Sequence, residues 1–190
     1  MYSFTVQLLV SVCIFVYLYG ECVAKKTWEA TPMSIGGSTT NPSAMDMDLR
    51  IERISRGEFG FSGTFFWNID MDENVMVEMR ILSSYSGRED DYKMTPWSIQ
   101  PQKFTDYIDT FYKDMLIPNL GNCTDLPRFD SGFVPPWPKG NFNFTRCSCN
   151  GNGLPEVMSE GFYRAEAIIT ALPTVALNVS VVLRIKTKMF

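Results

Sequence analysis

The chain has 190 residues, a formal net charge of −4 and no histidine, and 45% of its residues are hydrophobic. This length supports one domain with a sizeable core, and the mild acidity disfavours nucleic acid as a partner, because binding it requires a clustered basic face. Without histidine, Ser-His-Asp and Cys-His catalysis cannot be built in their usual forms.

The amino-terminal residues have the pattern of a secretory signal peptide. Leu8 to Tyr19 contain no charge, which matches the length of a signal-peptide core and is too short to span a bilayer. We assign residues 1–24 to the signal peptide and residues 25–190 to a single β domain, with cleavage after Ala24 and Gly20 as the alternative site. We therefore expect a secreted, extracellular protein whose mature chain has no integral membrane segment.

Residues 31–44 are small, polar and rich in Gly and Pro, and they predict a loop. From Met45 to Glu52 apolar and charged residues alternate strictly, which predicts a half-buried strand. After a turn at Arg56-Gly57 the alternation continues in a second strand that pairs with the first. Its inward residues are Phe59, Phe61, Phe65 and Trp67, and Gly60 and Gly63 mark bends or bulges.

The next turn, at residues 70–74, leads to a third strand in antiparallel order from Val75. The apolar period then changes to 3.6, which predicts one amphipathic helix at about residues 101–117, with Pro101 in its first turn and Pro118 ending it. The apolar stripe of this helix comprises Phe104, Tyr107, Ile108, Phe111 and Met115.

Three prolines make residues 132–138 a stiff apolar loop. Strands resume at Phe142, at Tyr163 and at Val175. About six strands and one helix indicate a mostly β fold, either an antiparallel β-sandwich or a β-cup.

The cysteines and sequons fit an oxidising compartment. Cleavage at the preferred site leaves Cys123, Cys147 and Cys149, of which two should pair. We predict a Cys123–Cys147 disulfide, because these residues follow the helix and end the Phe142 strand, with Cys149 as the alternative partner. Cleavage at the alternative site would retain Cys22 as a fourth cysteine. The candidate glycosylation sites are Asn122, Asn143 and Asn178.

No pattern for catalysis or for a bound metal or cofactor is evident. A closed zinc site is not expected, since histidine and a fourth thiolate are missing. A carboxylate-pair glycosidase needs two acids flanking a substrate, whereas the acids here fall mainly on outer strand faces or in turns. We therefore expect a protein that is not an enzyme and that uses no cofactor.

Two segments of the chain resemble the insect chemosensory B family. One runs from Phe142 through Cys147 to Leu154-Pro155-Glu156 and Glu160-Gly161-Phe162-Tyr163-Arg164, and the other is Asn122-Cys123-Thr124-Asp125-Leu126-Pro127. The similarity extends upstream through Trp28-Glu29 and the Met45 strand. This family is distantly similar to ganglioside-activator proteins, which implies a lipid-recognition β cup around an apolar cavity.

The resemblance also implies a function. Family members are secreted into the fluid of chemosensory sensilla and contribute to pheromone and gustatory responses. We therefore expect this chain to bind a small apolar ligand, such as a pheromone, hydrocarbon or lipid, and to act with a chemosensory receptor or ion channel. Phe61, Phe65, Trp67 and Phe111 are the candidate wall residues. The alternative is a secreted interaction module with a solid core that docks on a receptor or channel.

Overall fold

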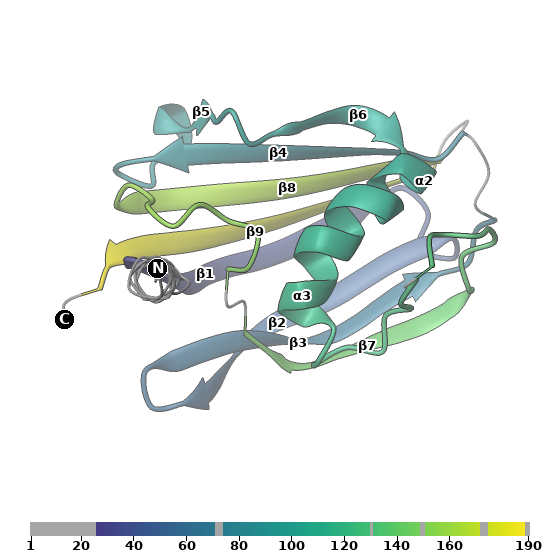
Figure 1. The fold of residues 1–190 in the computed structure, drawn as a ribbon, viewed down its shortest axis with the longest axis horizontal. Coiled ribbons are helices and arrows are strands. Elements are labelled where there is room, and N and C mark those ends of the chain that lie inside the picture. The colour runs from purple at the N-terminus through teal and green to yellow at the C-terminus, as the bar shows by residue number, and fades with distance from the viewer. Residues whose placement is uncertain (1–25, 71–73, 130, 149–150, 172–174, 189–190) are drawn as a thin grey trace, which may run out of the picture.

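The computed structural model describes residues 26–70, 74–129, 131–148, 151–171 and 175–188. They form a mostly β domain in which two antiparallel sheets pack together with one helix (Figure 1). This confirms the predicted fold class. The expected signal peptide, its two cleavage sites and Cys149 lie outside the described residues.

The larger sheet brings together strands from both halves of the chain. Its main path is β1 (Trp28–Thr39), β9 (Val175–Thr187), β8 (Gly161–Ala171), β4 (Met76–Ser84) and β5 (Lys93–Met94), and β6 (Ile99–Lys103) also pairs with β4. A short 3-10 turn, η1 (Glu89–Asp91), precedes β5.

The smaller sheet has the order β2 (Met45–Ser55), β3 (Glu58–Trp67) and β7 (Gly140–Cys147). The predicted first two strands are thus confirmed, together with their antiparallel pairing. Gly63 lies where the β3–β7 register shifts, and a Cβ there would come within 1.9 Å of the Asp48 carbonyl oxygen. Only glycine permits that approach, as expected for a bulge.

The predicted loop at residues 31–44 is wrong over most of its length. Residues up to Thr39 belong to β1, which pairs along its length with β9. The hydrogen-bonding edge of β9 outweighs the weak strand propensity of the small residues, because strand propensity depends on context. At Gly37 a Cβ would lie 3.2 Å from the Asn178 carbonyl oxygen of β9, so the absence of a side chain favours this close pairing.

The predicted order of the third strand is also wrong. After Trp67 the chain passes from the smaller sheet to the larger one, where β4 pairs with β8, β6 and β5 and not with β3. The free edge of β3 is taken by β7 instead. Pairing between strands far apart in sequence leaves no local signal, so alternation alone could not assign the sheets.

The helix begins and ends three residues later than predicted. It runs from Phe104 to Leu120 as α2 (Phe104–Tyr107), a π-helical segment η2 (Ile108–Leu116) and α3 (Ile117–Leu120). Pro101 lies in β6, a strand at the sheet margin where a missing N–H is tolerated. Pro118 does not end the helix, because it lies in the first turn of α3, where proline is accommodated.

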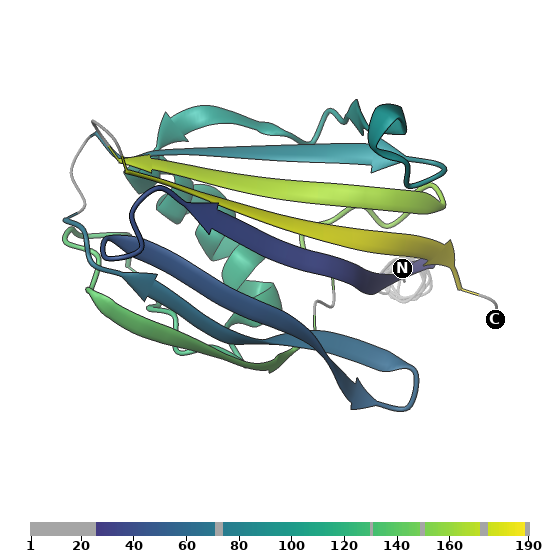
Figure 2. The same cartoon turned by 180° about the vertical axis from the view of Figure 1, so that it is seen from behind.

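The helix connects the two sheets. At its start the Phe104 amide donates to the Val75 carbonyl beside β4 at 2.9 Å, and at its end Cys123 is bonded to Cys147 of β7. Figures 1 and 2 show the helix crossing one side of the domain, with both sheets behind it in the first view and in front of it in the second. The helix therefore fixes the distance between the sheets.

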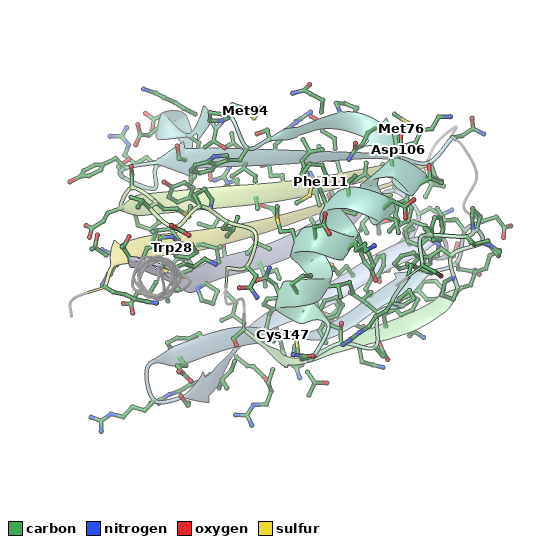
Figure 3. The ribbon with its side chains drawn as sticks, viewed as in Figure 1. Trp28, Met76, Met94, Asp106, Phe111 and Cys147 are labelled. Atoms are coloured by element: carbon green, nitrogen blue, oxygen red, sulfur yellow. A yellow bond between two sulfur atoms is a disulfide. The ribbon has the colours of Figure 1, made fainter. Side chains whose placement is uncertain are left out.

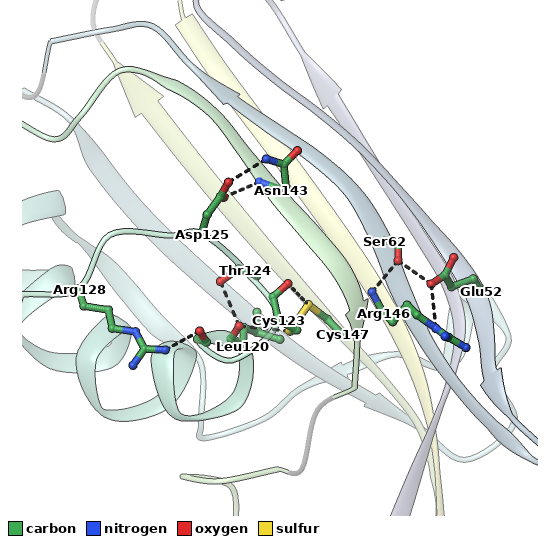
Figure 4. Close-up of a disulfide and its surroundings, with 11 residues drawn as sticks. Glu52, Ser62, Leu120, Cys123, Thr124, Asp125, Arg128, Asn143, Arg146 and Cys147 are labelled. Carbon is green, nitrogen blue, oxygen red and sulfur yellow. Dashed lines mark hydrogen bonds and ion pairs between the residues drawn. A yellow bond between two sulfur atoms is a disulfide. The ribbon is translucent and has the colours of Figure 1, made fainter.

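The disulfide joins Cys123 and Cys147, whose Cα atoms are 5.3 Å apart (Figure 4). This is the predicted pairing. A backbone hydrogen bond reinforces the disulfide, since the Thr145 amide donates to the Cys123 carbonyl at 2.8 Å. The Asn143 side-chain amide also donates to the Asp125 carboxylate at 2.8 Å. The segment after the helix is thus attached to β7, with an isolated β-bridge between Thr124 and Phe144.

All three sequon asparagines are exposed, so glycosylation would not disturb packing. We expect the secreted protein to begin at Lys25 and to carry N-linked glycan at Asn143 or Asn178. Mass spectrometry of secreted material before and after enzymatic deglycosylation measures both features. An intact Met1 terminus would contradict the processing, and an unchanged mass after deglycosylation would contradict the glycan.

Candidate ligand-binding site

An apolar cavity of about 240 Å³ lies between the sheets and the helix. Its wall includes Ile35, Met47, Leu49, Phe61, Phe65, Trp67, Val77, Phe104, Tyr107, Tyr112, Leu116, Leu120, Leu126, Trp137, Phe144, Ala167, Ile169, Leu177, Val179 and Val181. These side chains come from both sheets, the helix and the loop before β7. Figure 3 shows how side chains occupy the space between the helix and the sheets.

The floor of the cavity is the inward face of β8 and β9. The antiparallel register places Ala167 opposite Val179 and Ile169 opposite Leu177, so successive pairs point to the same side. Ala167 is the smallest side chain of the wall. A larger residue at this position would project into the cavity.

Three of the four predicted wall residues line the cavity, namely Phe61, Phe65 and Trp67. Trp67 is fully buried, and its ring centroid is 5.7 Å from that of Phe65. Phe59, which the alternation placed on the same face, is instead exposed. Phe59 lies beyond the end of the β3–β7 pairing, which begins with Phe61 opposite Cys147, so this end of the hairpin is not covered by β7.

Phe111 does not belong to the cavity wall. It packs beside Tyr107, with ring centroids 6.4 Å apart. The middle of the helix forms i→i+5 hydrogen bonds, such as that from the Ile117 amide to the Tyr112 carbonyl, and so has wider turns than an α-helix. The inward stripe therefore passes through Tyr112 and Leu116, whereas a 3.6-residue period selects Phe111 and Met115.

Trp137 is the central aromatic residue of the core, and sequence reasoning missed it. Its side chain is only 3% exposed and packs against six other rings, with centroid distances of 5.4 to 6.4 Å. These rings are Trp67, Phe104, Tyr112, Phe129, Phe133 and Phe142. The proline-rich segment is a loop, as predicted, and it places an anchor in the core. A tryptophan between prolines was the available signal.

The cavity wall has no charged side chain. Burial raises the pKa of the Tyr107 hydroxyl to about 12, and burial also raises the pKa of Tyr112, with nearby Tyr107 adding to the effect. Both tyrosines therefore stay protonated at physiological pH. The site can exclude water and bury apolar surface, and it presents neutral polar groups only.

Of the segments that resemble the chemosensory B family, Leu126 and Phe144 line the cavity, whereas Trp28 and the segments after Cys147 pack away from it. The Trp28 indole donates to the Pro155 carbonyl at 2.8 Å, and Trp28 clusters with Met158, Tyr163 and Ile185. The Glu160 carboxylate accepts from the Thr187 amide at 2.9 Å. These motif residues hold the end of the larger sheet together, which is a structural role.

A family model described as "Protein of unknown function (DUF1091)" matches residues 77–165. This match covers a little under half of the chain. A search of curated proteins finds no match. The DUF1091 segment runs from β4 into β8 and includes the helix, the disulfide and the Trp137 loop. It supplies Val77, Phe144 and the wall residues of the helix and the loops, whereas β1, β2, β3, β9 and the last part of β8 supply the rest of the wall.

Two further features bear on the chemistry of the chain. Within the described ranges no group of three or more His, Cys, Asp or Glu side chains is placed to hold a metal ion. The same residues include no helix that is long and apolar enough to cross a membrane.

Proposed function

We propose that this protein binds a small apolar ligand in the cavity between its sheets and carries or presents it without transforming it. The observation that supports this is an almost wholly apolar cavity lined by side chains of both sheets and the helix. Close packing normally leaves few voids larger than a water molecule, and a bound ligand would explain why a cavity of this size is present. A ligand would gain about 25 cal/mol for each Å² of its apolar surface removed from water.

The size of the cavity limits the ligand. A volume of about 240 Å³ falls just below the range of about 300–1,000 Å³ that is typical of drug-sized ligands. One aliphatic chain or a similarly small molecule fits this space, whereas a lipid with several acyl chains does not. Pheromone-like compounds, short hydrocarbons and fatty-acid derivatives are therefore the proposed ligand class.

The proposed setting is the extracellular fluid of a chemosensory organ. The disulfide supports an oxidising compartment, and the resemblance to the chemosensory B family supports a role in pheromone or gustatory response. A chemosensory receptor or ion channel is the proposed partner that receives the ligand. No cofactor is part of this proposal.

Filling the cavity tests the proposal. Replacing Ala167 with leucine should lower the affinity for 2-tridecanone at least tenfold, because the new side chain occupies ligand space. The free energy of unfolding should stay equal or rise by up to about 2 kcal/mol, because the leucine fills a void. Calorimetric titration and urea unfolding measure the two quantities.

The matched control is Ala176→Leu. It makes the same change in β9, on the face of the larger sheet that points away from the cavity. It should leave affinity unchanged. In a solid core Ala167→Leu would overpack the interior and cost about 1–3 kcal/mol of stability. That result, with no saturable binding in the wild type, would contradict the proposal.

One observation favours the alternative function, a secreted interaction module that docks on a receptor or channel. Tyr85 is 87% exposed, and it borders a more polar cleft of about 470 Å³ together with Met94 and Trp97. Exposed aromatic and methionine side chains are typical of protein-binding surfaces. If the wild type binds no apolar compound, docking through this cleft becomes the better account, and Tyr85→Ala should then weaken receptor binding.

A further inference from the structure

Tyr107 brings an unused polar group to the apolar cavity. Its side chain is 9% exposed, and its hydroxyl makes no hydrogen bond with any residue that the structure describes. Other buried tyrosines are satisfied. The Tyr112 hydroxyl donates to the Pro127 carbonyl at 2.5 Å, and the Tyr163 hydroxyl donates to the Ser159 carbonyl at 3.1 Å.

A second donor without a partner lies at the same end of the cavity. The indole Nε1 of Trp137 is buried and has no acceptor within hydrogen-bonding distance in the described structure. The indole of Trp67, in contrast, donates to the Ile69 carbonyl at 3.0 Å. Both Tyr107 and Trp137 pack on the ring of Phe104, with centroid distances of 6.2 and 5.4 Å. This end of the cavity therefore has two hydrogen-bond donors, the Tyr107 hydroxyl and the Trp137 indole, that no described acceptor satisfies.

Buried polar groups are almost always hydrogen-bonded, because leaving one unsatisfied costs the free energy of its desolvation. Among the described residues the Trp137 indole nitrogen is such an exception, and Trp137 lines the cavity. The Tyr107 hydroxyl, on the same wall, is not completely buried but also makes no hydrogen bond with a described residue. A ligand oxygen near Phe104 would supply the missing acceptor. A saturated hydrocarbon would leave both donors unsatisfied.

We infer that the ligand is a single aliphatic chain carrying a neutral oxygen acceptor, to which the Tyr107 hydroxyl donates. Ketones, aldehydes, esters and alcohols belong to this class. The acceptor is neutral because no cationic side chain lines the cavity, and a buried carboxylate without a counter-charge would be strongly disfavoured. This inference rests on the proposed function and specifies its ligand.

Tyr107→Phe tests the hydrogen bond, because it removes the hydroxyl and keeps the ring. The probes are 2-tridecanone and tridecane, which have the same chain length and differ by one carbonyl oxygen. In the variant, the affinity for 2-tridecanone should fall about fivefold to tenfold, the value of one neutral hydrogen bond, while the affinity for tridecane stays the same. Tyr163→Phe, outside the cavity, should change neither affinity.

The outcomes separate the two proposals. If both probes bind the wild type and Tyr107→Phe leaves the affinity for 2-tridecanone unchanged, the inference is overturned and the ligand cavity stands. An equal loss for both probes would overturn it as well, because the ring and not the hydroxyl would then be responsible. If neither probe binds the wild type, the proposed function and the inference both fail.

Discussion

Replacing Trp137 with alanine should lower the free energy of unfolding by about 3–5 kcal/mol, the range for large aromatic residues removed from a core. The indole is buried and contacts six rings from β3, β7, the helix and its own loop. Its loss therefore removes contacts that hold the helix and the proline-rich loop against β3 and β7. Urea unfolding followed by circular dichroism measures the change.

Trp97→Ala is the matched control for this variant. Trp97 is partly exposed and stacks on one ring, that of Tyr163, at a centroid distance of 6.2 Å. Its removal should cost about 1 kcal/mol or less, in line with the value of a single aromatic pair. Equal losses for Trp97→Ala and Trp137→Ala would show that the Trp137 loop is not the aromatic centre of the core.

Removing the disulfide should have the next largest effect. Changing Cys123 and Cys147 together to alanine should lower the free energy of unfolding by about 3–4 kcal/mol, because the bond closes a loop with a sequence separation of 24. Cys147 is also fully buried, so lost packing adds to the loss from the freed chain. Denaturant unfolding of the variant and the oxidised wild type measures the difference.

The region that loses local stability should show whether the disulfide acts locally or stabilises the whole domain equally. Hydrogen exchange should accelerate most in α3 and β7, which the bond joins, and least between β8 and β9, which a continuous ladder holds. Non-reducing peptide mapping of the wild type provides the check. Recovery of Cys123 as a free thiol would contradict the pairing.

Local patterns in the sequence predict most of the individual elements. Alternation from Met45 predicts β2, and the aromatic repeat predicts β3, because a half-buried strand imposes a period of two on its own residues. The apolar stripe predicts that a helix follows β6. The same patterns cannot predict β1, since its small residues form a strand only because β9 offers them a partner.

The candidate site was predictable only in part. Phe61, Phe65 and Trp67 could be predicted, because an aromatic strand face in a β domain points inward. Tyr112 was not, because the π-helical turn changes which residues face the core. Trp137 depends on the path of a proline-rich loop. These features follow from tertiary packing, which determines where irregular backbone lies.

The most direct test of a ligand inside the fold is a set of intermolecular nuclear Overhauser effects between 2-tridecanone and the methyl groups of the wild-type protein. The account predicts contacts from the ligand chain to Ala167, Ile169 and Val179, which line the cavity. Contacts confined to exposed methyl groups such as those of Val134 and Val157, or no contacts at saturating ligand, would contradict it.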